Sequence, residues 1–177
     1  MPKRSFITKE VEEYRRSLKT VLMTTRFNNR TWNENQEYLQ EIQRSSKCEI
    51  SCIYSSPLPL AQSIQPNATV FVLEMNNEEN KIMGIGLITN KIYYDCHHIY
   101  QTNKYNKFTY TGKYRIPRQE NDLFHILDKL CFTGKRHQKR LTGIKQFPID
   151  MLYNCKTLAN KDLIEMIANT FRSRNGK

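Results

Sequence analysis

Two apolar stretches separated by a polar turn constrain the fold of this chain most strongly. Residues 69–75 read Thr-Val-Phe-Val-Leu-Glu-Met and are rich in β-branched and aromatic side chains, which favour strands. Residues 76–80 are all polar, and residues 81–89 are mainly apolar again. This pattern predicts a β-hairpin over residues 69–89.

Further strands are expected on both sides of this hairpin. Residues 49–54 predict a short strand, and the prolines in residues 57–66 predict a loop after it. Two more strands are predicted at residues 107–111 and 113–116, joined as a hairpin at Gly112. Because alternate side chains of a strand share a face, such a hairpin would present one basic face.

The two ends of the chain predict helices. Apolar residues recur at helical spacing over residues 11–22, and Thr31 followed by Glu34 matches a capping box that would begin a second helix. Apolar faces at residues 123–131, with Asn121 or Asp122 as the cap, and at residues 163–171 predict two more helices.

These elements predict a single α+β domain over residues 1–177, with a small curled sheet flanked by N- and C-terminal helices. Its expected parts are a helical segment at residues 1–47, a β-rich core at residues 48–118, and a helical segment at residues 119–177 that carries a basic loop.

The net charge of +11 is confined to the second half of the chain. Up to Asn80, ten Lys and Arg balance ten Asp and Glu, whereas eighteen face seven from Lys81 onward. Residues 91–145 also hold all four His and six of the ten Tyr. Cations suit phosphates and aromatic rings suit bases, so this region predicts nucleic-acid binding, although a solvated basic surface would have the same composition.

The basic and aromatic side chains of this region are the predicted nucleic-acid-binding residues. They are Lys104, Lys107, Tyr110, Lys113, Arg115, Arg118, Lys135, Arg136, His137, Lys139, Arg140 and Lys145. The loop at residues 134–140 fits phosphate binding, a nuclear-localisation-like cluster and a solvated loop equally well.

Residues 50–89 resemble the start of a PUA-like barrel, the superfamily that includes the EVE, YTH and ASCH domains. The matching features are Cys-Ile-Tyr at residues 52–54, a proline-containing loop, Ile-Gln-Pro-Asn-Ala-Thr at residues 64–69, and the glycine-bearing strand at residues 82–88. Family members usually place Gly-Asp near residues 67–68, where this chain has Asn-Ala.

The resemblance implies a small β-barrel that binds RNA or modified DNA, with a base held in a pocket beside the first strand. Tyr54 and Ser55 are the residues that the resemblance assigns to this pocket. The Trp-built cage of methyl-base readers has no match in this segment, since the single Trp32 lies outside it.

Enzymatic alternatives depend on the cluster Asp95-Cys96-His97-His98. A nuclease or other nucleic-acid-modifying enzyme would use Asp95 with His97 or His98. A zinc site would need Cys48 and Cys52 as well, but in a strand these lie about 13 Å apart, which is too far for one metal. We therefore expect no metal, no cofactor and no catalysis, with a structural nucleic-acid-condensing or acidic-partner-binding protein as a third possibility.

The sequence also predicts a cellular location. It has no membrane-length apolar run and no secretory signal, and its five irregularly spaced Cys do not suggest a disulfide framework. An intracellular protein of the nucleus or cytoplasm is expected. Abundant Asn, Lys, Ile and Tyr are typical of an AT-rich genome such as that of a protist or a large DNA virus, in which case the location is that of the host cell.

Overall fold

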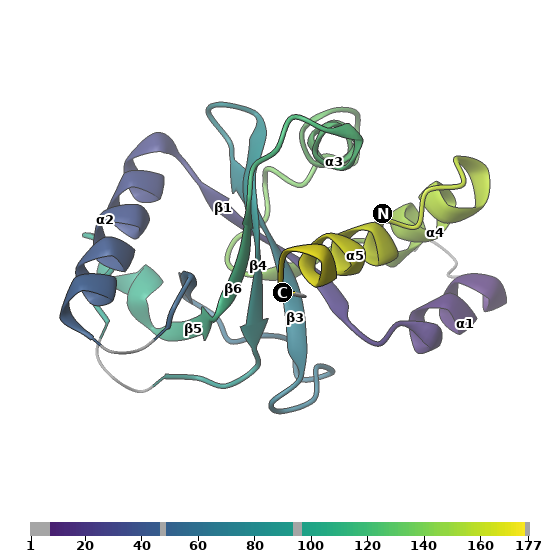
Figure 1. Ribbon diagram of the computed structural model, residues 1–177. Coiled ribbons are helices and arrows are strands. Elements are labelled where there is room, and N and C mark those ends of the chain that lie inside the picture. Colours follow the sequence, from purple (N-terminus) through teal and green to yellow (C-terminus); the bar gives the residue numbers. More distant parts are fainter. Residues whose placement is uncertain (1–7, 47–48, 94–96, 176–177) are drawn as a thin grey trace, which may run out of the picture.

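The computed structural model describes residues 8–46, 49–93 and 97–175 (Figure 1). This part of the chain contains seven strands, five α-helices and one 3-10 helix. Strands and helices both contribute to the core, so the predicted α+β class is confirmed. None of the helices in these ranges is long and apolar enough to cross a membrane.

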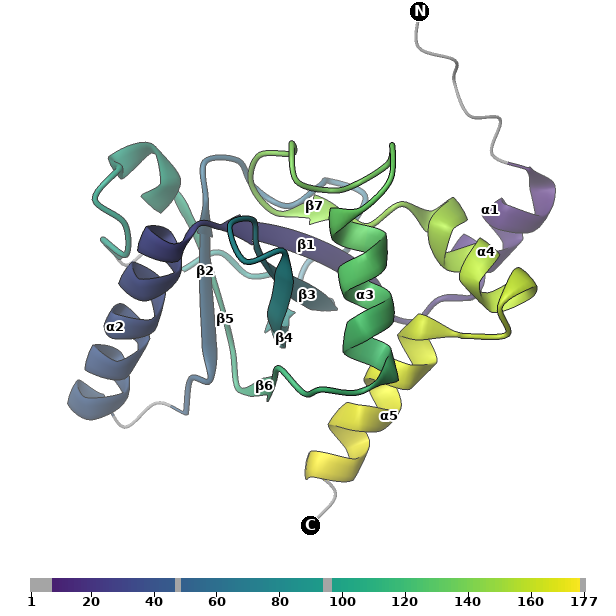
Figure 2. The same ribbon diagram turned by 90° about the horizontal axis from the view of Figure 1, so that it is seen from above.

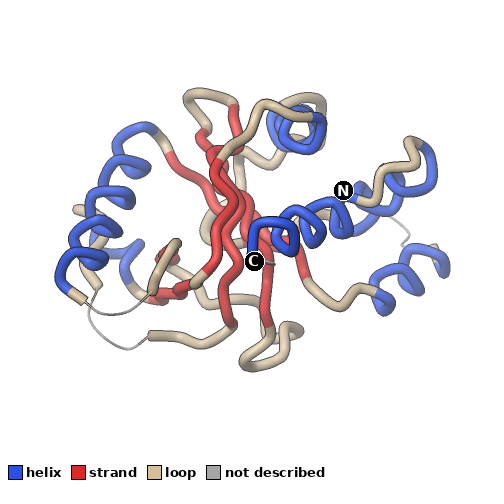
Figure 3. The backbone as a smooth tube through the Cα atoms, in the orientation of Figure 1, coloured by secondary structure: helices blue, strands red, loops and turns tan. Residues whose placement is uncertain are grey.

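A five-stranded mixed sheet forms the central layer (Figure 3). In spatial order its strands are β6 (Tyr114–Pro117), β4 (Lys81–Thr89), β3 (Thr69–Asn76), β1 (Val21–Phe27) and β7 (Lys145–Gln146). β1 runs parallel to β3, and the other neighbouring pairs are antiparallel.

The β3–β4 hairpin confirms the strongest prediction from the sequence. Asn76 lies opposite Lys81 across the turn, and Asn80 adopts a left-handed φ of 52°. Asn is one of the few non-glycine residues that enter this region readily, which is why a polar turn suits this position. Apolar residues of both strands pack against opposite faces of the sheet.

β1 contradicts the prediction that residues 11–22 form one continuous helix. Helix α1 (Lys9–Ser17) ends before Leu18, and the chain then extends into β1 beside β3. The apolar spacing fits a helix locally, but Val21, Thr24 and Thr25 are β-branched and Leu22 to Thr25 are all buried. The segment at residues 1–47 is therefore not purely helical, and the last third contributes β7.

A second layer consists of β2 (Cys52–Ser56) paired with β5 (Phe108–Gly112). The predicted hairpin between residues 107–111 and 113–116 is wrong, because β5 pairs with β2 whereas β6 pairs with β4. Gly112 allows this switch between layers, since a Cβ there would collide with the carbonyl oxygen of Leu87 in β4. The two sheets stay separate over the described residues and form no closed barrel.

Helices cover both faces of the central sheet (Figure 1). On one face lie α1, α3 (Asp122–Phe132), α4 (Ile149–Leu158) and α5 (Leu163–Asn175). The opposite face is covered by the β2–β5 layer and by α2 (Asn29–Ser45). The 3-10 helix η1 (Asn103–Asn106) precedes β5.

The helix starts were predicted with mixed success. Asn121 caps α3 as expected, accepting a hydrogen bond from the N–H of Phe124 at 3.1 Å. The capping box of α2 begins at Asn28 and not at Thr31, because Asn28 and Thr31 exchange reciprocal side-chain-to-backbone bonds. α4 was not predicted from the sequence, since its apolar face is short.

Candidate nucleic-acid interface

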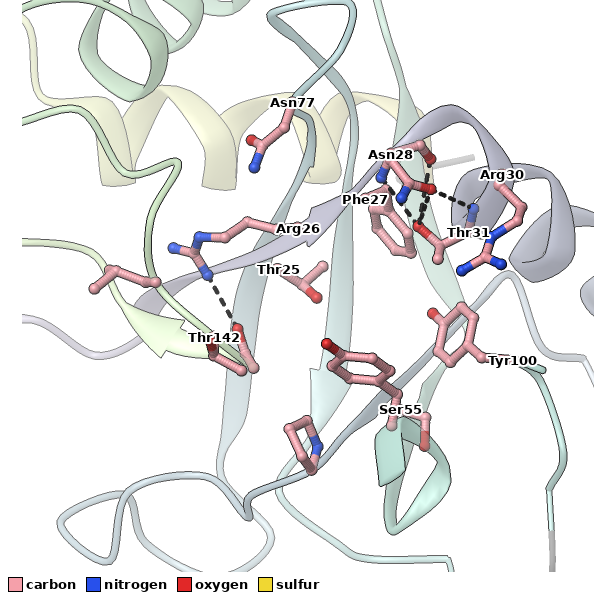
Figure 4. Close-up of a pocket in the computed structure, with 14 residues that line it drawn as sticks. Thr25, Arg26, Phe27, Asn28, Arg30, Thr31, Ser55, Asn77, Tyr100 and Thr142 are labelled. Atoms are coloured by element: carbon pink, nitrogen blue, oxygen red, sulfur yellow. Dashed lines mark hydrogen bonds between the residues drawn. The ribbon is translucent and has the colours of Figure 1, made fainter. Parts of the chain in front are cut away.

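A polar cavity of about 290 Å³ opens where β1 ends and α2 begins (Figure 4). Segments from β1, α2, β2, the loop before β5 and the loop before β7 surround it. The fourteen described residues that line it include two arginines and no acidic residue. They are Thr25, Arg26, Phe27, Asn28, Arg30, Thr31, Ser55, Pro57, Asn77, Tyr100, Tyr105, Leu141, Thr142 and Gly143.

Arg26 supplies a positive charge that is held only by neutral oxygen atoms. Its guanidinium donates to the carbonyl oxygens of Gln138 at 2.5 Å and Gly143 at 3.0 Å, and to the hydroxyl of Thr24 at 2.6 Å. Burial lowers the pKa of Arg26 to about 10, so the group remains protonated at neutral pH. Among the described residues it forms no ion pair with a carboxylate, which leaves its charge available to an anion.

The first turn of α2 supplies the second arginine. Asn28 and Thr31 cap this turn, with the N–H of Thr31 donating to Asn28 Oδ1 at 2.8 Å and the N–H of Asn28 donating to Thr31 Oγ1 at 3.0 Å. Arg30 is exposed, and its only ion pair within the described ranges is a long one of 3.8 Å to Glu34. The Glu34 side chain is only 14% exposed, but at 3.8 Å the contact is too long for a hydrogen bond, so the exposed Arg30 side chain can turn toward a ligand.

Hydroxyl groups and tyrosine rings form the remaining walls. Ser55 shares a hydrogen bond of 3.0 Å with the hydroxyl of Thr109, and Asn35 donates to the Tyr100 hydroxyl at 3.2 Å. Tyr105 lies in η1, with the ammonium of Lys104 5.1 Å from its ring centroid. The cavity therefore combines cations, hydrogen-bonding groups and aromatic surface.

The basic loop at residues 134–140 is docked beside this cavity. Asn77, which lines the cavity, donates to the carbonyl oxygen of Lys139 at 3.0 Å, and Lys139 Nζ donates to Asn80 Oδ1 at 2.7 Å. Gln138 is buried, and its N–H donates to the carbonyl oxygen of Cys131 at 2.7 Å. In Figure 2 the loop before β7 and η1 lie along the same side of the molecule.

Apart from Ser55, none of the predicted binding residues lines the polar cavity, and the predicted cations lie at several places on the described surface. Lys104 lies in η1 and Lys107 directly follows it, and both line a shallow depression with His97 and His98. Lys135 and Arg140 are exposed on the basic loop, where His137 and Lys139 are half-buried. Lys145 lies in β7 and is half-buried, whereas Lys113 lies at the turn between β5 and β6.

Three predicted arginines are engaged in ion pairs within the protein. Arg115 Nη2 lies 2.6 Å from Glu74 Oε2, and Arg118 Nη2 lies 2.9 Å from Asp128 Oδ2. Arg136 binds both carboxylate oxygens of Asp150, at 2.6 and 3.0 Å, and lowers the pKa of that carboxyl group. Their role in nucleic-acid binding stays a prediction, since a ligand would have to compete with these carboxylates for the guanidinium groups.

The two predicted tyrosines with a base-binding role are buried. Tyr110 is 0% exposed, and its hydroxyl accepts a hydrogen bond from the N–H of Leu60 at 3.0 Å. Tyr54 is also fully buried and donates to Glu74 Oε1 at 2.6 Å. Neither ring is accessible to a base, because both are packed in the hydrophobic core that the β2–β5 layer forms with the central sheet and α2. Of the implied pocket residues, only Ser55 reaches the cavity.

The described residues show no arrangement that would support the nuclease or zinc alternatives. Asp95, Cys48 and Cys96 lie outside those residues. His97 Nδ1 is 2.5 Å from the hydroxyl of Tyr38, and no group of three or more His, Cys, Asp or Glu suited to a metal ion occurs in the described ranges.

Sequence reasoning missed Arg26 and Arg30, the two cations of the cavity. An arginine amid the apolar and Thr-rich residues 21–27 was the available signal, but this stretch was not recognised as a strand. No protein-family model, curated protein or solved structure matches the chain, so its own geometry carries the functional argument.

Proposed function

We propose that the chain is a non-enzymatic nucleic-acid-binding protein whose polar cavity receives one nucleotide unit. The observation that carries this proposal is a cavity lined by two arginines and no acidic residue, beside a basic loop. Lysines and arginines around the cavity would contact neighbouring phosphates, which position a nucleic acid without reading its sequence.

Arg26 is the central feature of the proposed site. A guanidinium shielded from water interacts more strongly with an anion than an exposed one does. Because all three nitrogens of Arg26 already donate to oxygen atoms of the protein, it would act on a phosphate mainly through its charge. The volume of about 290 Å³ lies near the lower end of the range for ligand sites, which suits a single nucleotide unit better than a large ligand.

A PUA-like relationship of residues 50–89 would agree with a nucleotide unit bound in the polar cavity. The resemblance assigns Ser55 to a base pocket, and Ser55 is among the residues that line the polar cavity. Thr25, Thr142 and Asn77 would add hydrogen-bonding groups for a base edge. Tyr54 has no part in this pocket, because it is buried against Glu74.

The test is filter binding of labelled DNA and RNA across a salt series, with Arg30→Gln compared against Arg44→Gln. Both arginines are exposed, but Arg44 lies about 21 Å further along α2, at 1.5 Å per residue. We expect affinity to fall linearly with salt on logarithmic axes, and R30Q to reduce the slope by about one unit, as for one lost phosphate contact. R44Q should match the wild type.

The outcomes separate the alternatives. Absent binding at low salt, or a flat salt response, would reject nucleic acid as the ligand. Equal effects of R30Q and R44Q would move the interface away from the polar cavity. Cleavage of the nucleic acid that requires a divalent metal would favour the nuclease alternative, and equal affinity for every polyanion would favour the condensing or acidic-partner-binding alternative.

A further inference from the structure

A second depression, here called the tyrosine groove, lies where β5 leads into β6. Its volume is about 600 Å³, roughly twice that of the polar cavity. The residues that matter most for its chemistry are Ile50, Leu87, Lys91, Tyr93, Lys113 and Tyr114. Glu49 also lines it, so two cations face one carboxylate.

Tyr93 and Tyr114 stand out because their rings are exposed. Tyr93 is 41% exposed and Tyr114 is 46% exposed. Neither side chain forms a hydrogen bond or a ring contact with the described residues, unlike the buried Tyr54, Tyr100 and Tyr110. Two unpartnered aromatic rings on one groove offer flat apolar surface to a ligand.

The backbone beneath both rings is fixed. Ser51 donates from its N–H to the carbonyl oxygen of Gly112 at 2.8 Å and from its hydroxyl to the carbonyl oxygen of Lys113 at 2.7 Å. The N–H of Tyr93 donates to the carbonyl oxygen of Thr109 at 3.0 Å. Rigid support of this kind reduces the entropy that a ligand must overcome on binding.

We infer that the tyrosine groove binds single-stranded nucleic acid, with unpaired bases stacked on Tyr93 and Tyr114 and phosphates beside Lys91 and Lys113. A single strand alternates flat apolar bases with negative charges, which is the chemistry that exposed rings flanked by lysines complement. A duplex keeps its base faces stacked inside and offers only phosphates. This inference rests on the proposed function and names the form of nucleic acid that the protein prefers.

The experiment compares an oligothymidylate of about 12 nucleotides, a length within single-strand site sizes, with an abasic strand of equal length. The abasic strand keeps the phosphates and removes the bases. Wild-type protein should bind the oligothymidylate at least about fivefold more tightly, since stacking on a single ring gives roughly that factor. The double variant Y93L/Y114L should lose most of this preference.

The matched control is the double variant Y93F/Y114F, which keeps both rings and should keep the preference. Circular dichroism and thermal unfolding check that both variants fold, which the exposure of these side chains favours. The Leu variant isolates the groove from the polar cavity, because that cavity is unchanged in it.

An unchanged ratio between the two strands in Y93L/Y114L would overturn the inference and leave the proposed function standing. Absence of binding to either strand and to duplex at low salt would overturn both.

Discussion

At the scale of single residues, Glu74 is a buried carboxylate held by Tyr54 and Arg115. It is 1% exposed, accepts a hydrogen bond from Tyr54 at 2.6 Å and receives two donors from Arg115, at 2.9 Å from Nε and 2.6 Å from Nη2. A buried carboxylate is tolerated only when such partners replace its hydration. The acid within the apolar residues 69–75 is therefore a structural group that joins the central sheet to the β2–β5 layer.

Glu74→Gln should lower the free energy of unfolding by about 3 kcal/mol, because it leaves the largely buried Arg115 without its counter-charge. Urea unfolding followed by circular dichroism measures the change. Glu120→Gln is the matched control: Glu120 also pairs with an arginine, Arg118, but is 67% exposed, and Arg118 keeps Asp128. Similar losses of unfolding free energy in both variants would show that the burial of Glu74 does not make its ion pair more important for stability.

At the scale of elements, glycines in β4 decide how closely the second layer can approach the central sheet. A Cβ at Gly86 would collide with the hydroxyl of Tyr54 and lie 2.9 Å from Cys52 Sγ. The strand residues that face β2 must therefore be small. Gly86 marks this close approach, as glycines within a strand often do, whereas a Cβ at Gly84 would collide with Arg115 and Glu74.

Gly86→Ala should destabilise the fold by about 1–3 kcal/mol, the usual cost of forcing an extra methyl group into packed surroundings. Thermal and urea unfolding give the value. Gly134→Asn serves as the control, because Gly134 has nothing within 4 Å of its Cβ position and its φ of 77° is one that Asn tolerates. If the two variants unfold alike, the tight packing of Tyr54 on β4 is not energetically important.

At the scale of the whole molecule, ion pairing decides which cations carry the excess of +11. Arg115, Arg118 and Arg136 are balanced by carboxylates, whereas Lys135, Lys139 and Arg140 of the basic loop form no ion pair within the described ranges. The loop therefore contributes cations on the side of the molecule where the polar cavity opens.

Replacing Lys135, Lys139 and Arg140 together with Gln should weaken binding by a similar factor on every sequence, and lower the salt slope by about 2–3 units. Filter binding on several unrelated sequences measures both. The control replaces Lys9, Arg172 and Arg174 with Gln. This variant loses the same amount of charge, but from helices on the other face of the sheet. Equal losses from both triple variants would mean that net charge matters and position does not.

The sequence by itself determined the elements whose pattern is local. The β3–β4 hairpin, the capped α3, the apolar face of α5 and the buried Cys131 all follow from the spacing of apolar residues and from turn or cap chemistry. The segregation of charge is likewise a property of the sequence. These features could be predicted because their causes lie within a few residues of one another.

Only the tertiary structure decided what depends on neighbours distant in sequence. Residues 21–27 became a strand because β3 and β7 pair with them on either side, and β5 and β6 separated because β2 and β4 offered different partners. The polar cavity draws Arg26, Ser55 and Thr142 from distant parts of the chain. Pairing and burial of this kind depend on contacts across the whole fold, which local propensity does not encode.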